Sequence, residues 1–126
     1  MVAHIQQLVA NDFAALNSTV IAQLHSEVPL IESIGHYITE AGGKRMRPVL
    51  VLLTSNNLGY TGSDHIELAT VIEFLHTATL LHDDVVDMSE MRRGRPTANT
   101  KWDNPSSVLV GDFIYSRAFE LLVNIG

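Results

Sequence analysis

Residues 64–88 read DHIELATVIEFLHTATLLHDDVVDM and hold the longest helical pattern of the chain. Ser63 or Asp64 is a suitable N-cap for this helix, and Glu67 lies where it completes a capping box with Asp64. Apolar residues continue through the stretch to about Met88. We therefore predict one long helix from residue 64 to about residue 88, and the rest of the chain is interpreted around it.

Apolar residues recur at three- and four-residue steps in most of the remaining sequence, as one buried helix face requires. This spacing predicts helices over about residues 2–24 and 29–40. A third helix begins near Pro48, which a first turn tolerates, and ends at residues 57–59. The third helix is apolar nearly all round, so we expect it to be buried.

Residues 89–104 have the composition of a loop, with glycine, proline and asparagine. Ser106 or Ser107 then opens a fifth helix that runs to about Val123. No stretch of the chain predicts a strand. The expected fold is all-α, a single bundle of about five helices with short connections.

The composition limits the class of protein. The 126 residues are 46% hydrophobic, which is enough for one globular domain with a core. The formal net charge of -6 argues against a nucleic-acid-binding module. The lack of cysteine excludes thiolate zinc sites and cysteine nucleophiles and suits a reducing compartment. Because the pattern contains neither a signal peptide nor a transmembrane segment, we expect a cytoplasmic protein.

Three aspartates lie within five residues at the end of the longest predicted helix. Asp83 and Asp87 are four residues apart and share one helix face, with Asp84 beside them. Their like charges repel one another, and the helix dipole disfavours anions near a C-terminus. This arrangement indicates a compensating cation, and carboxylate oxygens suit Mg²⁺, which bridges them to substrate phosphates. A solvated acidic helix end is the alternative for the aspartates taken alone.

Six of the eight lysines and arginines fall into two short segments, GGKRMRP at residues 42–48 and MRRGRP at residues 91–96. A helix N-terminus with adjacent lysine and arginine binds anions, and the arginine fork contacts two phosphate oxygens at once. Either segment taken singly is also typical of a solvated surface. Together with the three aspartates, the two segments predict a metal-bridged diphosphate with a second anion beside it.

Four blocks of the sequence, GGKRMRP, HTATLLHDDVVD, MRRGRPTAN and SSVLVGDFIYSRAF, occur in the order and spacing of the trans-polyprenyl diphosphate synthases. The chain resembles this family over nearly its whole length and looks most like the bacterial octaprenyl diphosphate synthases. The resemblance implies an isoprenoid-synthase-type helical bundle whose cavity receives an allylic diphosphate and isopentenyl diphosphate. It also implies the reaction: the allylic diphosphate ionises, its carbocation attacks the isopentenyl double bond, and a proton is lost.

The resemblance implies a role for each motif residue. Asp83, Asp84 and Asp87 match the first aspartate-rich motif, which binds Mg²⁺ and through it the allylic diphosphate. Arg92 matches the arginine that contacts this diphosphate. The residues that match the binding site for isopentenyl diphosphate are Lys44, Arg47, His76 and Arg93. The geometry agrees for His76, since it lies seven residues before Asp83 and so within about 20° of it on the helix.

The residues before the aspartates bear on product length. Ala78 and Thr79 match positions where short-chain members of the family carry aromatic residues that close the cavity. Small side chains here, with Leu75 lining a deeper turn, imply an open tunnel and a medium- or long-chain, octaprenyl-like product. The alternative for Leu75 is plain core, because apolar residues at helical spacing are usually packed inside.

No second aspartate-rich motif follows Asp87, although the family has one on a later helix. We therefore expect residues 1–126 to be the N-terminal part of one polyprenyl synthase domain and a poor catalyst alone. Its exposed apolar faces would favour a homodimer or a domain-swapped oligomer. Two other classes stay open: a helical subunit of a heteromeric prenyl synthase, and a terpene cyclase-like enzyme, which shares the aspartates but not the paired basic segments.

Overall fold

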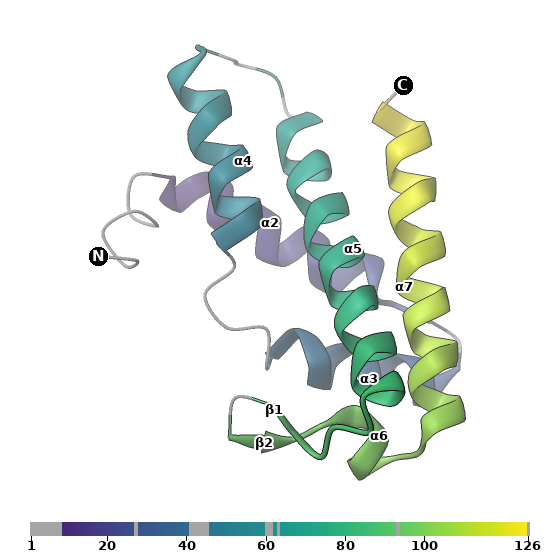
Figure 1. The fold of residues 1–126 in the computed structure, drawn as a ribbon. Coiled ribbons are helices and arrows are strands. Elements are labelled where there is room, and N and C mark those ends of the chain that lie inside the picture. Colours follow the sequence, from purple (N-terminus) through teal and green to yellow (C-terminus); the bar gives the residue numbers. More distant parts are fainter. Residues whose placement is uncertain are drawn as a thin grey trace.

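The computed structural model describes residues 9–26, 28–40, 46–59, 62, 64–92 and 94–125. In this part of the chain, six helices and one two-stranded antiparallel sheet follow one another (Figure 1). The elements are α2 (Ala10–Gln23), α3 (Pro29–Glu40), α4 (Met46–Asn57), α5 (Asp64–Val86), β1 (Met91–Arg92), β2 (Arg95–Pro96), α6 (Ala98–Lys101) and α7 (Asn104–Ile125). The predicted all-α fold class is confirmed.

The two longest helices, α5 and α7, run side by side in opposite directions and form the centre of the fold (Figure 1). Their close approach has a clear cause at Gly111, in the middle of α7. A Cβ built on this glycine would lie 2.6 Å from Cδ2 of His82 on α5, which is closer than real atoms approach. Glycine is therefore the residue that lets the histidine ring occupy the space between the two helices.

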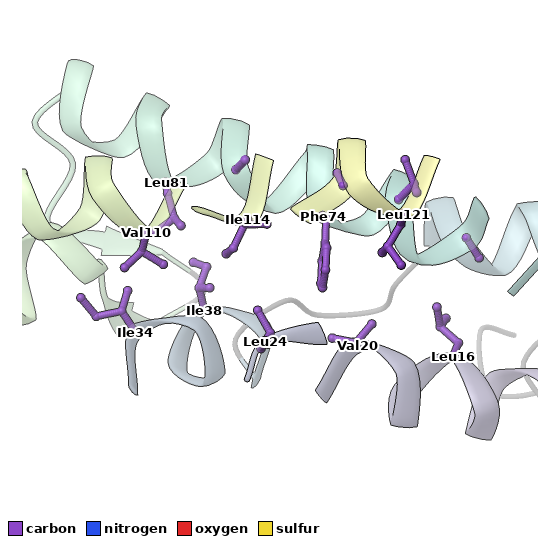
Figure 2. Close-up of a cluster of buried hydrophobic side chains, with 14 of the residues drawn as sticks. Leu16, Val20, Leu24, Ile34, Ile38, Phe74, Leu81, Val110, Ile114 and Leu121 are labelled. Carbon is purple, nitrogen blue, oxygen red and sulfur yellow. The ribbon is translucent and has the colours of Figure 1, made fainter. Parts of the chain in front are cut away.

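The core forms where α2 and α3 pack against the α5–α7 pair (Figure 2). Phe74 of α5 is fully buried and is the largest side chain of this core. The other buried apolar residues labelled in Figure 2 are Leu16, Val20, Leu24, Ile34, Ile38, Leu81, Val110, Ile114 and Leu121. Burial of such side chains contributes about 1.5–3 kcal/mol each and is the main force that holds the four helices together.

Most predicted helix boundaries agree with the structure. The helix expected over residues 29–40 is α3, and the third helix ends at Asn57 as its turn signals predicted. The first helix is described from Ala10, and residues 1–8 of the prediction lie outside the described residues, as does the possible cap Ser63. Helix α5 starts at Asp64 and ends at Val86, two residues before the predicted end, because Met88 takes a left-handed φ of 53°.

The start of the last helix was predicted two residues too late. Helix α7 begins at Asn104, and the Asp103 carboxylate accepts a hydrogen bond of 2.7 Å from the backbone N–H of Ser106. The Ser106 hydroxyl and this N–H hold the pKa of Asp103 below its usual value. Asp103 is therefore the N-cap, a role that the sequence pattern assigned to the serines.

The prediction of a plain loop without strands over residues 89–104 was wrong in detail. Met91 pairs with Pro96 and Arg92 with Arg95 in a short antiparallel hairpin. Gly94 makes its turn with a φ of 76°, and the one-turn helix α6 follows. Two-residue strands are too short to show the alternation of apolar and polar residues by which a strand is recognised.

Burial of α4 was also predicted too strongly. Val49 and Leu52 are buried, but Leu50 is 54% exposed and Leu58 lies open beyond the helix end. The outer face of α4 thus has no covering element in the described part of the chain. Separately, none of the described helices is both long and apolar enough to cross a membrane.

Candidate active site at the end of α5

The three aspartates predicted as a metal site lie at the C-terminal end of α5, but not in equivalent surroundings. Asp83 and Asp87 are exposed, and the N–H of Asp87 donates to the carbonyl of Asp83 at 2.8 Å, which extends the helical pattern to Asp87. Asp84, in contrast, is turned inward, and its side chain is only 3% exposed. The helix end therefore presents two open carboxylates and one buried carboxylate.

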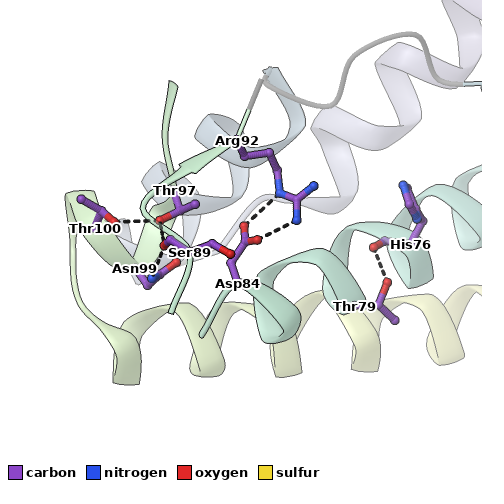
Figure 3. A network of polar contacts seen from close by, with 8 residues as sticks. All are labelled: His76, Thr79, Asp84, Ser89, Arg92, Thr97, Asn99 and Thr100. Atoms are coloured by element: carbon purple, nitrogen blue, oxygen red, sulfur yellow. Dashed lines mark hydrogen bonds and ion pairs between the residues drawn. The ribbon is translucent and has the colours of Figure 1, made fainter. Parts of the chain in front are cut away.

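The buried carboxylate is bound by Arg92 of β1 (Figure 3). Nε of Arg92 donates to one oxygen of Asp84 at 3.0 Å, and Nη2 donates to the other oxygen at 2.6 Å. This two-point ion pair holds the pKa of Arg92 above its usual value, with added help from the charges of Asp83 and Asp87. Arg92 is thus fixed against Asp84, eight residues before it, and the loop folds back over the end of α5.

The base of the loop that carries Arg92 is closed by hydrogen bonds to Ser89 (Figure 3). The carbonyl of Ser89 accepts from the Thr97 hydroxyl at 2.8 Å and from the Asn99 amide at 3.0 Å. The N–H of Thr97 donates to the carbonyl of Glu90 at 2.9 Å, and Thr97 is almost fully buried. These polar residues were missed by the sequence reasoning, although serine, threonine and asparagine at a turn commonly bond to nearby backbone groups.

The second predicted anion site is partly assembled two turns earlier on α5. Nη1 of Arg47, at the start of α4, lies 3.2 Å from Nε2 of His76. Because arginine has no acceptor, the imidazole nitrogen must accept and is unprotonated in this arrangement. The structure thus brings together two residues 29 positions apart that were predicted to bind one diphosphate. Lys44 and Arg93, the other two residues of that prediction, lie outside the described residues.

The donor groups fit Mg²⁺ at two of the three aspartates. Among the residues that the structure describes, no three acidic or histidine side chains converge closely enough to hold a metal ion by themselves. Mg²⁺ commonly takes only one or two carboxylates and completes its shell with water and substrate phosphate. The exposed pair Asp83 and Asp87, four residues apart on one face, suits that mode. Both oxygens of Asp84 are instead occupied by Arg92.

The residues predicted to line a tunnel fall on different sides of α5. Thr79 is exposed, one turn from Asp83, and its hydroxyl donates to the carbonyl of His76 at 2.6 Å. Leu75 is half-buried and packs against the core. Ala78 is only 1% exposed and belongs to the core, so it does not lie on the open face. The open face therefore carries Thr79 but not Ala78.

Two neighbouring apolar grooves lie at the other end of α5, beside α4. One of about 340 Å³ is lined by Leu50, Val51, Thr54, Ser55 and Leu68. The next, of about 260 Å³, shares Ser55 and Leu68 and is also lined by Asp64, His65 and Ile125. Leu68 lies 15 residues before Asp83, which corresponds to about 22 Å along the helix. An apolar surface thus begins about 22 Å from the charged end of the site.

This bundle, with aspartates and arginines at one end of a central helix, has the fold of the isoprenoid synthases. The decaprenyl diphosphate synthase from Rhodobacter capsulatus superposes with a TM-score of 0.95 at 50% identity, over 98% of this chain and 38% of that chain. A polyprenyl synthase from Caulobacter crescentus, solved with calcium and isoprenyl diphosphate, gives 0.94 at 41% identity, again over 98% and 38%.

Residues 28–126 match the polyprenyl synthetase family, and the chain belongs to this family. The octaprenyl diphosphate synthase of Escherichia coli is 52% identical over 122 residues, which are 97% of this chain and 38% of that protein. The chain therefore spans little more than a third of the length of these relatives. The family resemblance predicted from the four sequence blocks is confirmed.

Proposed function

We propose that the protein carrying this chain is a cytoplasmic trans-polyprenyl diphosphate synthase, and that residues 1–126 form the N-terminal part of its one catalytic domain. It extends an allylic diphosphate with isopentenyl diphosphate to a long-chain, octaprenyl-like product. The observation that carries this proposal is that two cationic contacts lie along α5: Arg92 of β1 contacts Asp84, and Arg47 of α4 contacts His76. Eight residues, or about 12 Å, separate Asp84 from His76 along α5.

Arg92 is proposed to bind the diphosphate of the allylic substrate. Its bonds to Asp84 use two of the five N–H donors of the guanidinium. The remaining three donors, on a side chain that is 30% exposed, are available to phosphate oxygens. Asp84 then orients the arginine rather than holding the metal, and a charge-assisted bond to the leaving diphosphate stabilises negative charge as the C–O bond breaks.

Asp83 and Asp87 are proposed to hold Mg²⁺. When bound, this ion would neutralise part of the charge of the leaving diphosphate. The carboxylates of the chain supply an open pair of hard oxygen ligands at a helix end where no lysine or arginine of α5 competes for them. Both are exposed, so phosphate oxygens and water can complete the coordination.

Arg47 and His76 are proposed to bind the diphosphate of isopentenyl diphosphate, together with Lys44 and Arg93. The Arg47 guanidinium uses one N–H donor for His76, and its other N–H groups can donate to an anion. A neutral imidazole that accepts at Nε2 carries its proton on Nδ1, and its second nitrogen is therefore a donor. Two anion sites on one helix would bring the two substrates side by side, which lowers the entropic cost of their reaction.

The growing chain is proposed to follow the open face of α5 from Thr79, past Leu75, toward the groove at Leu68. Thr79 is small enough to leave this path open, while Ala78 lies in the core. The exposed apolar residues of α7, including Val108, Phe119 and Leu122, would be covered by further protein in a homodimer or a domain-swapped oligomer.

The test is an elongation assay of the full-length protein with farnesyl diphosphate, isopentenyl diphosphate and Mg²⁺, followed by measurement of product chain length. We expect products well beyond the starter. Asp83→Asn should lower the rate by at least about 100-fold, since it removes a metal ligand. Glu120→Gln, an equally conservative change of an exposed acid on α7, should leave the rate unchanged. Absence of elongation would overturn the proposal, and elongation that stops after one or two isopentenyl units would overturn the open path along α5.

A further inference from the structure

A cluster of aromatic and cationic side chains joins α3 to the loop that carries Arg92. The hydroxyl of Tyr37 donates to the carbonyl of Pro96 at 2.6 Å, across 59 residues of sequence. The Arg95 guanidinium lies 4.3 Å from the centre of the Tyr37 ring, and Nζ of Lys101 lies 4.5 Å from it. The ring of Trp102 meets the Tyr37 ring edge-on at 5.1 Å. None of the four aromatic or cationic side chains, Tyr37, Arg95, Lys101 and Trp102, was assigned to the site described above.

Tyr37 contacts both residues of β2 and is one strand away from Arg92. Its hydroxyl holds Pro96, and its ring face holds Arg95. In the hairpin, Arg95 is the partner of Arg92, and Pro96 is the partner of Met91. A displacement of β2 therefore moves β1, and with it the backbone from which Arg92 reaches Asp84.

The hairpin needs a contact with another element, an anchor, because its two strands are too short to be stable alone. An isolated two-stranded hairpin is at best marginally stable in water, and this one has two residues in each strand. The bonds of Ser89 to Thr97 and Asn99 close the base of the loop but do not reach its tip. Helix α3, in contrast, is fixed in the core by Ile34 and Ile38. Tyr37 connects this rigid helix to β2 of the hairpin.

We propose that Tyr37 is a positioning residue for Arg92: through Pro96 and Arg95 it holds the hairpin where Arg92 can bind the allylic diphosphate. The inference rests on the proposed function, in which Arg92 is the ligand of that diphosphate. Tyr37 touches no substrate. Its effect is larger for the allylic diphosphate, because Arg47 and His76, which are proposed to bind isopentenyl diphosphate, lie on α4 and α5, and only Arg93 of that set belongs to the same loop.

The test compares Tyr37→Phe and Tyr37→Leu with Arg92→Gln in the full-length protein. Tyr115→Phe is the matched control, because it also removes a hydroxyl from a partly exposed tyrosine, here one paired edge-on with Phe119 on α7. Two quantities are measured: the hydrogen exchange rates of the backbone N–H groups of residues 91–95 without ligand, and the KM values for farnesyl and isopentenyl diphosphate. The exchange rates report on the anchor itself and do not depend on catalysis.

Tyr37→Phe is expected to raise the KM for farnesyl diphosphate roughly 2- to 10-fold, the effect of one lost hydrogen bond. Tyr37→Leu should raise it further, because the stacked cations lose their ring as well. Both variants should speed exchange in the hairpin and raise the KM for isopentenyl diphosphate less than the KM for farnesyl diphosphate, and Tyr115→Phe should change neither quantity.

Two results would overturn the inference alone: exchange and KM values that do not differ between the Tyr37 variants and Tyr115→Phe, or equal changes in both KM values. If Arg92→Gln leaves the KM for farnesyl diphosphate unchanged, the proposed role of Arg92 is wrong and the inference is overturned with it. The Arg92 variant thus separates failure of the proposed function from failure of the anchor.

Discussion

Helix α5 has two sides that differ in their surroundings far more than in their composition. On one side Phe74 and Leu81 are buried in the core that α5 forms with α2, α3 and α7 (Figure 2). On the other, Leu68, Thr79 and Asp83 are exposed, although Leu68 is as apolar as Leu81. The hydrophobic pattern accounts for the helix, but packing decides which side stays available for a ligand. All the chemistry proposed for α5 except the Asp84–Arg92 pair lies on the open side.

Of the substitutions that test this contrast, Phe74→Ala should lower the free energy of unfolding most. Removal of a fully buried aromatic ring from the core is expected to lower the free energy of unfolding by about 3–5 kcal/mol. Leu68→Ala, at a residue 39% exposed on the open side, should cost less than about 1 kcal/mol. Urea unfolding followed by circular dichroism measures both. Equal losses in the two variants would show that the open side is packed as well.

An intermediate loss of unfolding free energy is expected when Asp84 is replaced, and almost none when Asp83 is replaced. Asp84→Ala removes the partner of Arg92 and leaves a partly buried guanidinium unpaired, which should cost about 1–3 kcal/mol of unfolding free energy. Asp83→Ala removes an exposed charge from a repelling cluster, so the free energy should stay within about 0.5 kcal/mol of the unaltered protein. Thermal unfolding without Mg²⁺ distinguishes the two, and a loss at Asp83 as large as at Asp84 would contradict the separate roles given to them.

Among the substitutions expected to lower stability, the smallest effect is expected when Asp103, the N-cap of α7, is replaced. Its pKa is lowered by the bonds to Ser106, so its contribution to stability is present above the unfolded pKa of about 3.8 and is lost as the pH falls through the lower folded value. Asp103→Ala should therefore lower the melting temperature slightly at pH 7 and hardly at all near pH 2. A difference that grows toward low pH would show that the carboxylate is not the cap.

Much of the fold was predictable because the residues that start and end its helices act locally. Pro29, the residues at 57–59 and Asp64 mark helix ends within a few positions of sequence, and the structure agrees with each. The hairpin was not predictable, because what holds it in place is Tyr37, 59 residues before Pro96. The exposure of Leu50 was missed for a related reason: an apolar helix face indicates burial only when another element is present to cover it.

The site was predictable in its members but not in their pairing. Spacing alone placed Asp83 and Asp87 on one face, and the structure agrees. The family motifs pointed to Arg47 and His76, which the structure joins. Nothing in the spacing indicated that Asp84 would turn away from its neighbours toward Arg92, since that choice depends on where the chain returns after eight residues.

Gly111 limits how the aspartate motif can vary, although it lies on another helix. The ring that fills the space beside this glycine belongs to His82, the residue immediately before Asp83. Any larger residue at position 111 would displace that ring and its contacts to the Val108 carbonyl and the Asp112 carboxylate on α7. Substitutions at Gly111 should therefore loosen the contact between α5 and α7 next to the aspartate motif, and a genetic screen for loss of function should detect them.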